Sequence, residues 1–328
     1  MSLLLAGDIG GTKTALAIFS SEAGPRAPLV EAVFHSADYP SLEAVVRKFL
    51  AQAQLSVDRA SFGVAGPVVA GRAVLTNLPW VLDEAHLQRA LGLPAVRLLN
   101  DLEAMATAAP LLEATDLRTL QVGEVVPKGA IAVIAPGTAL GEAFLTWDGS
   151  QYRAHPSEGG HTDFAPTSAL EFGLLEYLKL RYDHVSYERV CSGLGLPHIY
   201  AYLKDHHQGV EPVWLTKQLQ NADDPTPVII GAALGEVRCD ICVETLNLFM
   251  SILGAEAGNL VLKVLATGGI YVGGGIPPRI LGALERGPFL ETFQRKGRHA
   301  DLLRRVPVHV MLNPKVGLLG AARHGLTT

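Results

Sequence analysis

Short apolar runs alternate along the chain with longer stretches in which apolar residues recur every three or four positions. Runs of the first kind predict buried strands, and stretches of the second kind predict amphipathic helices. The runs 3–9 and 14–19 lie on either side of residues 10–13 (GGTK), and they predict a hairpin of two strands joined by a glycine turn.

A second hairpin is predicted at mid-chain, where the runs 130–135 and 143–147 flank residues 136–141 (PGTALG). The two halves of the chain therefore share one plan. Strand and helix patterns alternate through both halves, which favours α/β architecture with two domains and a boundary near Pro110. Further predicted elements are helices at 41–50, between Asp83 and Gly92, and at 102–109, 169–181 and 228–253, with strands at 61–64 and 94–99.

The composition excludes several classes of protein. The 328 residues are 48% hydrophobic and 18% charged, which excludes a disordered chain. The 27 Lys and Arg residues are balanced by 32 Asp and Glu residues without any basic block, so a nucleic-acid partner is not expected. Three cysteines cannot form an even set of disulfides, which suits a reducing compartment.

No segment predicts export or a membrane partner. The apolar run 3–6 is short, lacks a basic flank and is soon followed by Asp8. The run 260–272 contains Lys263 and is shorter than the roughly 20 residues that a membrane span needs. We therefore expect a cytoplasmic protein.

The first turn carries groups that suit a phosphate and its magnesium. Residues 8–13 (DIGGTK) combine glycine N–H groups, which no side chain obstructs, with a hydroxyl, an ammonium and a carboxylate. The segment matches neither GxxxxGK[ST] nor GxGxxG, because a second strand follows it in place of a long helix. An ordinary hairpin turn also favours paired glycines, so this alternative stays open.

Asn100 and Asp101 follow a predicted strand, at the end where open α/β sheets bind ligands. Asp101 is a candidate general base, which would accept the proton of a hydroxyl as its oxygen attacks phosphorus. Either residue could instead cap the next helix, and Asn100 with Glu103 has the spacing of a capping box. The two roles are compatible.

Residues 157–161 (SEGGH) place Glu158 and His161 three positions apart across two glycines. Such a polar loop offers the donors and acceptors that bind sugar hydroxyls, although a histidine in a loop is more often simply solvated. Glu188 could add a third contact, or it could be the first-turn glutamate of a helix that begins at Ser186.

Two further motifs have ordinary structural explanations. Cys239 and Cys242 have the spacing of a metal or redox motif, but the helical pattern places them on one apolar face together with Leu246, Phe249 and Leu253. A buried core stripe and no structural metal are therefore expected. Residues 273–278 (GGGIPP) would let a base or ribose approach the backbone closely, but a tight crossover from strand to helix has the same need for glycine.

Four motifs occur in the order found in bacterial glucokinases, and the chain resembles that family from residue 5 to the segment 317–322 (GLLGAA). The SEGGHTDFAP segment is the most specific of them, whereas the glycine turns are shared with the wider hexokinase, actin and heat-shock ATPase superfamily. The four motifs are LAGDIGGTKT at 5–14, LNDLEA at 99–104, SEGGHTDFAP at 157–166 and GGGIPPR at 273–279.

The resemblance implies an α/β fold of two ribonuclease H-like (actin-like ATPase) domains with a cleft between them. The last helix would return to the first domain, so that residues 1–110 and 312–328 form a small domain and residues 111–311 a large one. The implied activity is ATP-dependent phosphorylation of the 6-hydroxyl of D-glucose to glucose 6-phosphate. Mg²⁺ would be a second cofactor, and the implied assembly is a homodimer.

The resemblance also assigns roles to matching positions. Asp101 would be the catalytic base. The sugar would be bound by Asn77, Asn100, Asp101, Glu158, His161 and Glu188. ATP would be bound by Asp8, Gly10, Gly11, Thr12, Lys13, Gly137, Thr138, Gly141, Gly274 and Gly275, and Asp8 would bind magnesium through water.

One position departs from the family pattern. The second phosphate turn usually reads GTGLG, and here Ala139 stands in the middle. Its methyl group is harmless at negative φ, whereas at positive φ it would cost about 1 kcal/mol or more and weaken nucleotide binding. Two other functions stay open: a kinase for another hexose, such as mannose or an N-acetylated sugar, and a sugar-binding sensor without catalysis.

Overall fold

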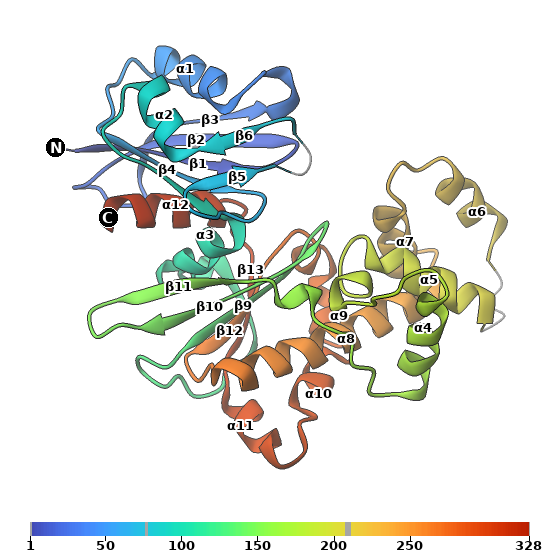
Figure 1. The fold of residues 1–328 in the computed structure, drawn as a ribbon. Coiled ribbons are helices and arrows are strands. Elements are labelled where there is room, and N and C mark those ends of the chain that lie inside the picture. The colour runs from blue at the N-terminus through green and yellow to red at the C-terminus, as the bar shows by residue number, and fades with distance from the viewer. Residues whose placement is uncertain (1, 76–77, 207–210, 328) are drawn as a thin grey trace. The chain divides into compact units, whose positions relative to one another are not determined.

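Figure 1 shows the fold, a computed structural model that describes residues 2–75, 78–206 and 211–327. The chain forms two compact units. The first unit takes its residues from Met1–Ala114, Ala143–Pro156 and Asn313–Thr328, and the second from Thr115–Glu142 and Ser157–Leu312.

The predicted domain ranges, 1–110 with 312–328 and 111–311, stay a prediction. The observed units differ from them because residues 111–114 and 143–156 count with the first unit and residue 312 with the second.

The first unit is built on a mixed five-stranded sheet in the order β3-β2-β1-β4-β7. β1 (Leu3–Ile9) and β2 (Lys13–Ser20) pair antiparallel and form the predicted hairpin. β3 (Pro28–His35) lies antiparallel to β2, and β4 (Arg59–Val64) and β7 (Val96–Asn100) continue the sheet parallel to β1. The short strands β5 (Arg72–Val74) and β6 (Val81–Asp83) form a separate antiparallel pair.

Helices cover both faces of this sheet. Alternate side chains of β1 point to opposite faces, and both sets are apolar, so each face is buried under helices. Leu5 and Ile9 pack in one cluster with α1 (Leu42–Ala53) and α2 (Glu84–Leu91). Leu4 and Ala6 pack on the other side against α12 (Val316–Thr327), which also contacts α3 (Asp101–Ala108). The last helix of the chain therefore returns to the first unit.

The other mixed sheet has six strands in the order β11-β10-β9-β12-β13-β8, and its strands β9, β12, β13 and β8 belong to the second unit. The inner strands β9 (Ile131–Pro136), β12 (Gly269–Val272) and β13 (Val308–Met311) are parallel, and β8 (Leu117–Gln121) is antiparallel to β13. β10 (Leu140–Trp147) follows β9 directly, in the place of the second predicted hairpin, and β11 (Tyr152–Ser157) is the edge strand.

The long helix α8 (Asp240–Val264) runs through the core of the second unit. The predicted apolar stripe is confirmed, because Cys242, Leu246, Phe249 and Leu253 are all buried, and Cys239 is buried at the helix N-cap. In length and composition α8 could cross a membrane, but 78% of its most apolar window is buried inside the protein, as in a core helix. The remaining helices are α4 (Ala169–Lys179), α5 (Gly195–His206), α6 (Val213–Gln220), α7 (Pro225–Leu234), α9 (Leu281–Leu284), α10 (Phe289–Gln294) and α11 (Ala300–Arg305).

Candidate active site

Three predicted site residues meet at one edge of the first sheet. Asp8 lies near the end of β1, and Asn100 ends β7, while β4 lies between these strands with its last residues in register with both. Because β1, β4 and β7 are parallel, their carboxyl ends share one edge, and Asp101 begins α3 at the same edge. Gly317 of α12 completes this corner, since a Cβ on Gly317 would lie only 2.8 Å from Oδ2 of Asp8.

The electrostatics of this corner fit a cation. Burial of Asp8, together with the nearby charge of Asp101, raises the pKa of the Asp8 carboxyl from its usual 3.8 to about 6. In the described part of the chain no three His, Cys, Asp or Glu side chains cluster in a way that would hold a metal ion. Magnesium needs no such cluster, because it keeps several waters and binds through one or two carboxylates and the substrate phosphates. Asp8 therefore fits a water-mediated magnesium site.

Hydrogen bonds within the turn and from Ser36 fix the conformation of the turn after β1. Gly10 N donates to Lys13 O (2.9 Å), which closes the turn. Ser36 binds the turn twice, since its Oγ donates to Gly10 O (2.8 Å) and its backbone N donates to Thr12 O (2.9 Å). Thr12 and Lys13 are exposed, so their side chains are open to solvent. Sequence reasoning missed Ser36, because its contact with the turn depends on where β3 ends.

The capping role falls to Asn100. Its Oδ1 accepts hydrogen bonds from the backbone N–H groups of Leu102 (2.9 Å) and Glu103 (3.3 Å). The Glu103 carboxylate accepts a hydrogen bond from the backbone of Asn100, so the predicted capping box is present. Asp101 Oδ1 also accepts from Leu102 N (2.9 Å), but Asn100 satisfies the same N–H group. The helix start thus does not depend on the Asp101 carboxylate.

In the second unit, the structure brings Glu188 close to His161. Glu188 Oε2 lies 3.8 Å from His161 Nε2 and accepts a hydrogen bond from Leu140 N (3.3 Å). The alternative of a helix that begins at Ser186 is confirmed as a single 3₁₀ turn, Tyr187–Arg189, with Glu188 in its first turn; Ser186 is the N-cap residue, but its side chain makes no capping hydrogen bond. Glu158 directly precedes the short turn Gly159–His161 and is exposed, as is His161.

Two of the three segments predicted to bind ATP, 137–141 and 274–275, meet in the second unit. Gly137 N donates to Ala139 O (2.9 Å), and Ile276 N donates to Pro136 O (3.3 Å), so the segment after β12 lies against the second turn. Gly274 has φ +85°, and a Cβ there would overlap Pro136 O. Gly275 lies next to Gly137.

Sequence reasoning missed one segment of this region. Gly193 N donates to Gly137 O (2.7 Å), and Leu194 N donates to Thr138 O (3.4 Å). The glycines at 193 and 195 could have suggested a second close backbone approach, because a Cβ on Gly193 would lie 3.0 Å from Gly137 O.

Two further predicted positions have separate outcomes. Asn77 lies outside the described residues. Ala139 is exposed and is not among the non-glycine residues with positive φ, so its methyl group does not strain the second turn. The only feature that favoured a sensor without catalysis is thereby removed.

Two mixed sheets, each with a glycine turn between two consecutive neighbouring strands (β1 and β2, β9 and β10), define a two-domain phosphotransferase of the actin-like ATPase superfamily. A family model described as Glucokinase matches residues 5–327. The chain belongs to the glucokinase family, whose members are ATP-binding kinases that act on glucose.

Known proteins resemble the chain over nearly its whole length. A glucokinase of Nostoc punctiforme is 43% identical over 335 residues, which cover 98% of each chain. The crystal structure of a glucokinase from an Antarctic psychrotroph has a TM-score of 0.85 at 31% identity and covers all of both chains. A ROK family glucokinase from Streptomyces griseus, solved in complex with glucose and AMPPNP, shares the fold, with a TM-score of 0.66 at 21% identity over all of both chains.

Proposed function

We propose that this glucokinase transfers the γ-phosphoryl group of ATP to the 6-hydroxyl of D-glucose, with Asp101 as the general base, and releases glucose 6-phosphate and ADP. One observation carries the assignment of the base. Asp101 begins α3 at the sheet edge that also holds Asp8, near enough for its charge to raise the pKa of Asp8, and the helix that it begins is capped by Asn100.

The phosphoryl group passes through a loose transition state, so the protein acts mainly by position and charge. The first turn (Gly10, Gly11, Thr12, Lys13) supplies N–H groups, a hydroxyl and an ammonium to the phosphate oxygens. The second turn (Gly137, Thr138, Gly141) binds phosphate through its backbone, and Gly274 with Gly275 leaves room for the adenosine. Asp8 would hold magnesium through water, and the ion would supply positive charge to the phosphates.

The sugar hydroxyls are held by Asn77, Asn100, Asp101, Glu158, His161 and Glu188. We call residues 157–161 the sugar loop. Its proximity to Glu188 supports this assignment, because a carboxylate and an imidazole 3.8 Å apart offer adjacent acceptor and donor groups to a polyol. The backbone N–H of Leu140 fixes Glu188 in this place.

The decisive experiment replaces Asp101 by Asn and measures ADP release in a coupled assay. Asn keeps the shape of the side chain but cannot accept the proton, so turnover should fall by about two orders of magnitude or more, with the Kd for glucose nearly unchanged. Asp83→Asn is the matched control. Asp83 is likewise an aspartate at the junction of a strand and a helix, and Asn can replace it as the cap of that helix. Nearly full turnover of Asp101→Asn would refute the assignment.

The same assay tests the sugar and the donor. Turnover with glucose should exceed turnover with mannose and with N-acetylglucosamine, and ATP should exceed other phosphoryl donors. Higher turnover with another hexose would reassign the substrate while leaving the role of Asp101 intact.

We further propose that the protein works in the cytoplasm as a homodimer. The three buried cysteines are all free, which suits a reducing compartment. Analytical ultracentrifugation should give twice the chain mass of 34.9 kDa, and a mass of one chain would refute the dimer.

A further inference from the structure

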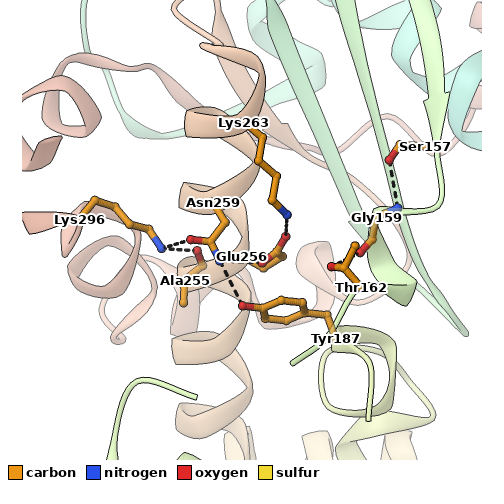
Figure 2. A network of polar contacts seen from close by, with 9 residues as sticks. All are labelled: Ser157, Gly159, Thr162, Tyr187, Ala255, Glu256, Asn259, Lys263 and Lys296. Atoms are coloured by element: carbon orange, nitrogen blue, oxygen red, sulfur yellow. Dashed lines mark hydrogen bonds and ion pairs between the residues drawn. The ribbon is translucent and has the colours of Figure 1, made fainter. Parts of the chain in front are cut away.

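Behind the sugar loop, the second unit contains a buried polar network that the proposed reaction does not use. Its centre is Glu256 on α8, whose side chain is fully buried. Glu256 accepts hydrogen bonds from Lys263 Nζ (2.9 Å) and Asn259 Nδ2 (2.8 Å). Asn259 Nδ2 also donates to the Tyr187 hydroxyl (3.1 Å), and Lys296 Nζ donates to Asn259 Oδ1 (2.6 Å). Figure 2 shows these side chains converging on α8.

Glu142 enters the same region from β10. It is only 1% exposed, and within the described part of the chain its Oε1 has no hydrogen-bond partner. Burial first, and the charge of Glu256 second, raise the pKa of Glu142 to about 8, although Lys263 opposes the shift. Two buried carboxyl groups thus lie close together, and the Lys263 ammonium forms its ion pair with Glu256, so the less costly state keeps a proton on Glu142.

Other titratable groups around this pair leave the balance unchanged. Tyr187 and Cys191 are held neutral, because burial and the charge of Glu256 raise the pKa of each. Lys296 faces the network from beyond α10, and its burial lowers its pKa. Glu142 is therefore the group of the network that gains a negative charge as pH rises above neutrality.

The sugar loop rests directly on Glu142. A Cβ on Gly159 would overlap Oε2 of Glu142, and a Cβ on Gly160 would overlap the carbonyl oxygen of Leu140. Both glycines of the SEGGH segment are thus required by close packing on the first residues of β10. Thr162, which directly follows the loop, is also tied to the network, because Tyr187 N donates to Thr162 O (3.0 Å).

We propose that Glu142 is a positioning residue for glucose: as a neutral carboxylic acid it supports the sugar loop at Gly159, and its ionisation displaces the loop. The inference rests on the proposed sugar-binding role of Glu158, His161 and Glu188. Glu142 does not touch the sugar in this account. It acts through the backbone of Gly159, which lies between Glu158 and His161 in the chain.

The test variant is Glu142→Gln, which keeps the shape of the side chain and stays neutral at every pH. Glu244→Gln is the matched control, because Glu244 lies on α8 but is exposed. For the wild type and Glu244→Gln, the KM for glucose should rise about fivefold or more between pH 7 and pH 9.5, whereas for Glu142→Gln it should rise less than about twofold. The change in kcat should be the same in all three.

Thermal unfolding without ligands provides a readout that does not depend on catalysis. A raised pKa means that the folded state loses stability as pH rises from about 4.5 to about 8. Glu142→Gln avoids this loss, so its Tm should match the wild type near pH 5 and exceed it by several degrees near pH 8.5.

Three outcomes would overturn the proposal: a Glu142→Gln variant that does not fold, one with no gain in Tm at alkaline pH, or one whose KM rises as in the wild type. Failure of the proposed function is recognised separately, because it would appear as normal turnover of Asp101→Asn and would leave the Tm comparison unaffected.

Discussion

Replacing Asp8 by Asn should stabilise the first unit at neutral pH, although it removes the carboxylate that binds magnesium in our proposal. The folded structure raises the pKa of Asp8 from 3.8 to about 6, chiefly by burial and then by repulsion from Asp101. Ionised Asp8 is therefore less favourable in the folded state than in the unfolded chain. Asn avoids this cost because it keeps the size of the side chain without its charge.

The magnitude follows from the pKa change. Each pKa unit is worth about 1.4 kcal/mol, so the change corresponds to about 3 kcal/mol. The proton is bound more tightly in the folded state, so stability due to this proton is complete below about pH 4 and is lost as pH rises to about 6. The advantage of Asn should thus be small near pH 4 and should reach about 3 kcal/mol above pH 6.

Urea unfolding, with no nucleotide present, measures this difference. Trp80 and Trp147 belong to the first unit and Trp214 to the second, so tryptophan fluorescence in a Trp214→Phe background reports mainly on the unit that contains Asp8. The urea midpoint of Asp8→Asn should exceed that of the parent at pH 7.5, with an unchanged m-value. The gain should be smaller in an Asp101→Asn background, because one source of the repulsion is then absent.

Two results would refute the reasoning: an Asp8→Asn variant that is no more stable than its parent at pH 7.5, or a gain of equal size near pH 4. The first result would mean that burial and the charge of Asp101 do not raise the pKa of the Asp8 carboxyl. The second would mean that the gain comes from packing and not from charge.

Two glycine-turn predictions concern nucleotide binding. Ala139→Gly should change the KM for ATP less than about twofold, because Ala139 is exposed and has no positive φ; a large improvement would show that the methyl group hinders the nucleotide. Gly274→Ala should raise the KM for ATP by about tenfold or more, since Gly274 has φ +85° and its Cβ would overlap Pro136 O; an unchanged KM would show that this segment does not contribute to the ATP site.

Local chemistry in the sequence predicted the elements that carry the candidate site. The two glycine turns lie between strands as expected, and Asp83 and Gly92 bound α2 as cap residues. The spacing of Asn100 and Glu103 predicted a capping box, which the structure contains. These features depend on residues close together in the chain, so the sequence pattern is enough to predict them.

Some elements were hidden because their local pattern was weak. The strand β3 was not predicted, because its outward positions Leu29 and Val33 are as apolar as its inward positions and so conceal the alternation. The single turn at Tyr187–Arg189 was open to interpretation as a helix start, because Ser186 has the chemistry of a cap but its side chain makes no capping hydrogen bond here.

The family, the order of the motifs and the candidate chemical residues could all be read from the amino-acid sequence. The folded chain was needed to show that Asn100 caps α3, that Ser36 hydrogen-bonds to the first turn, and that Glu142 lies against Gly159. The physical reason is that burial, pKa shifts and close backbone contacts depend on residues that are far apart in the chain. A sequence motif contains only residues that are close together in the chain. Glu142 and Glu256 are separated by more than a hundred residues, and each looks like an ordinary glutamate until the fold places both away from water.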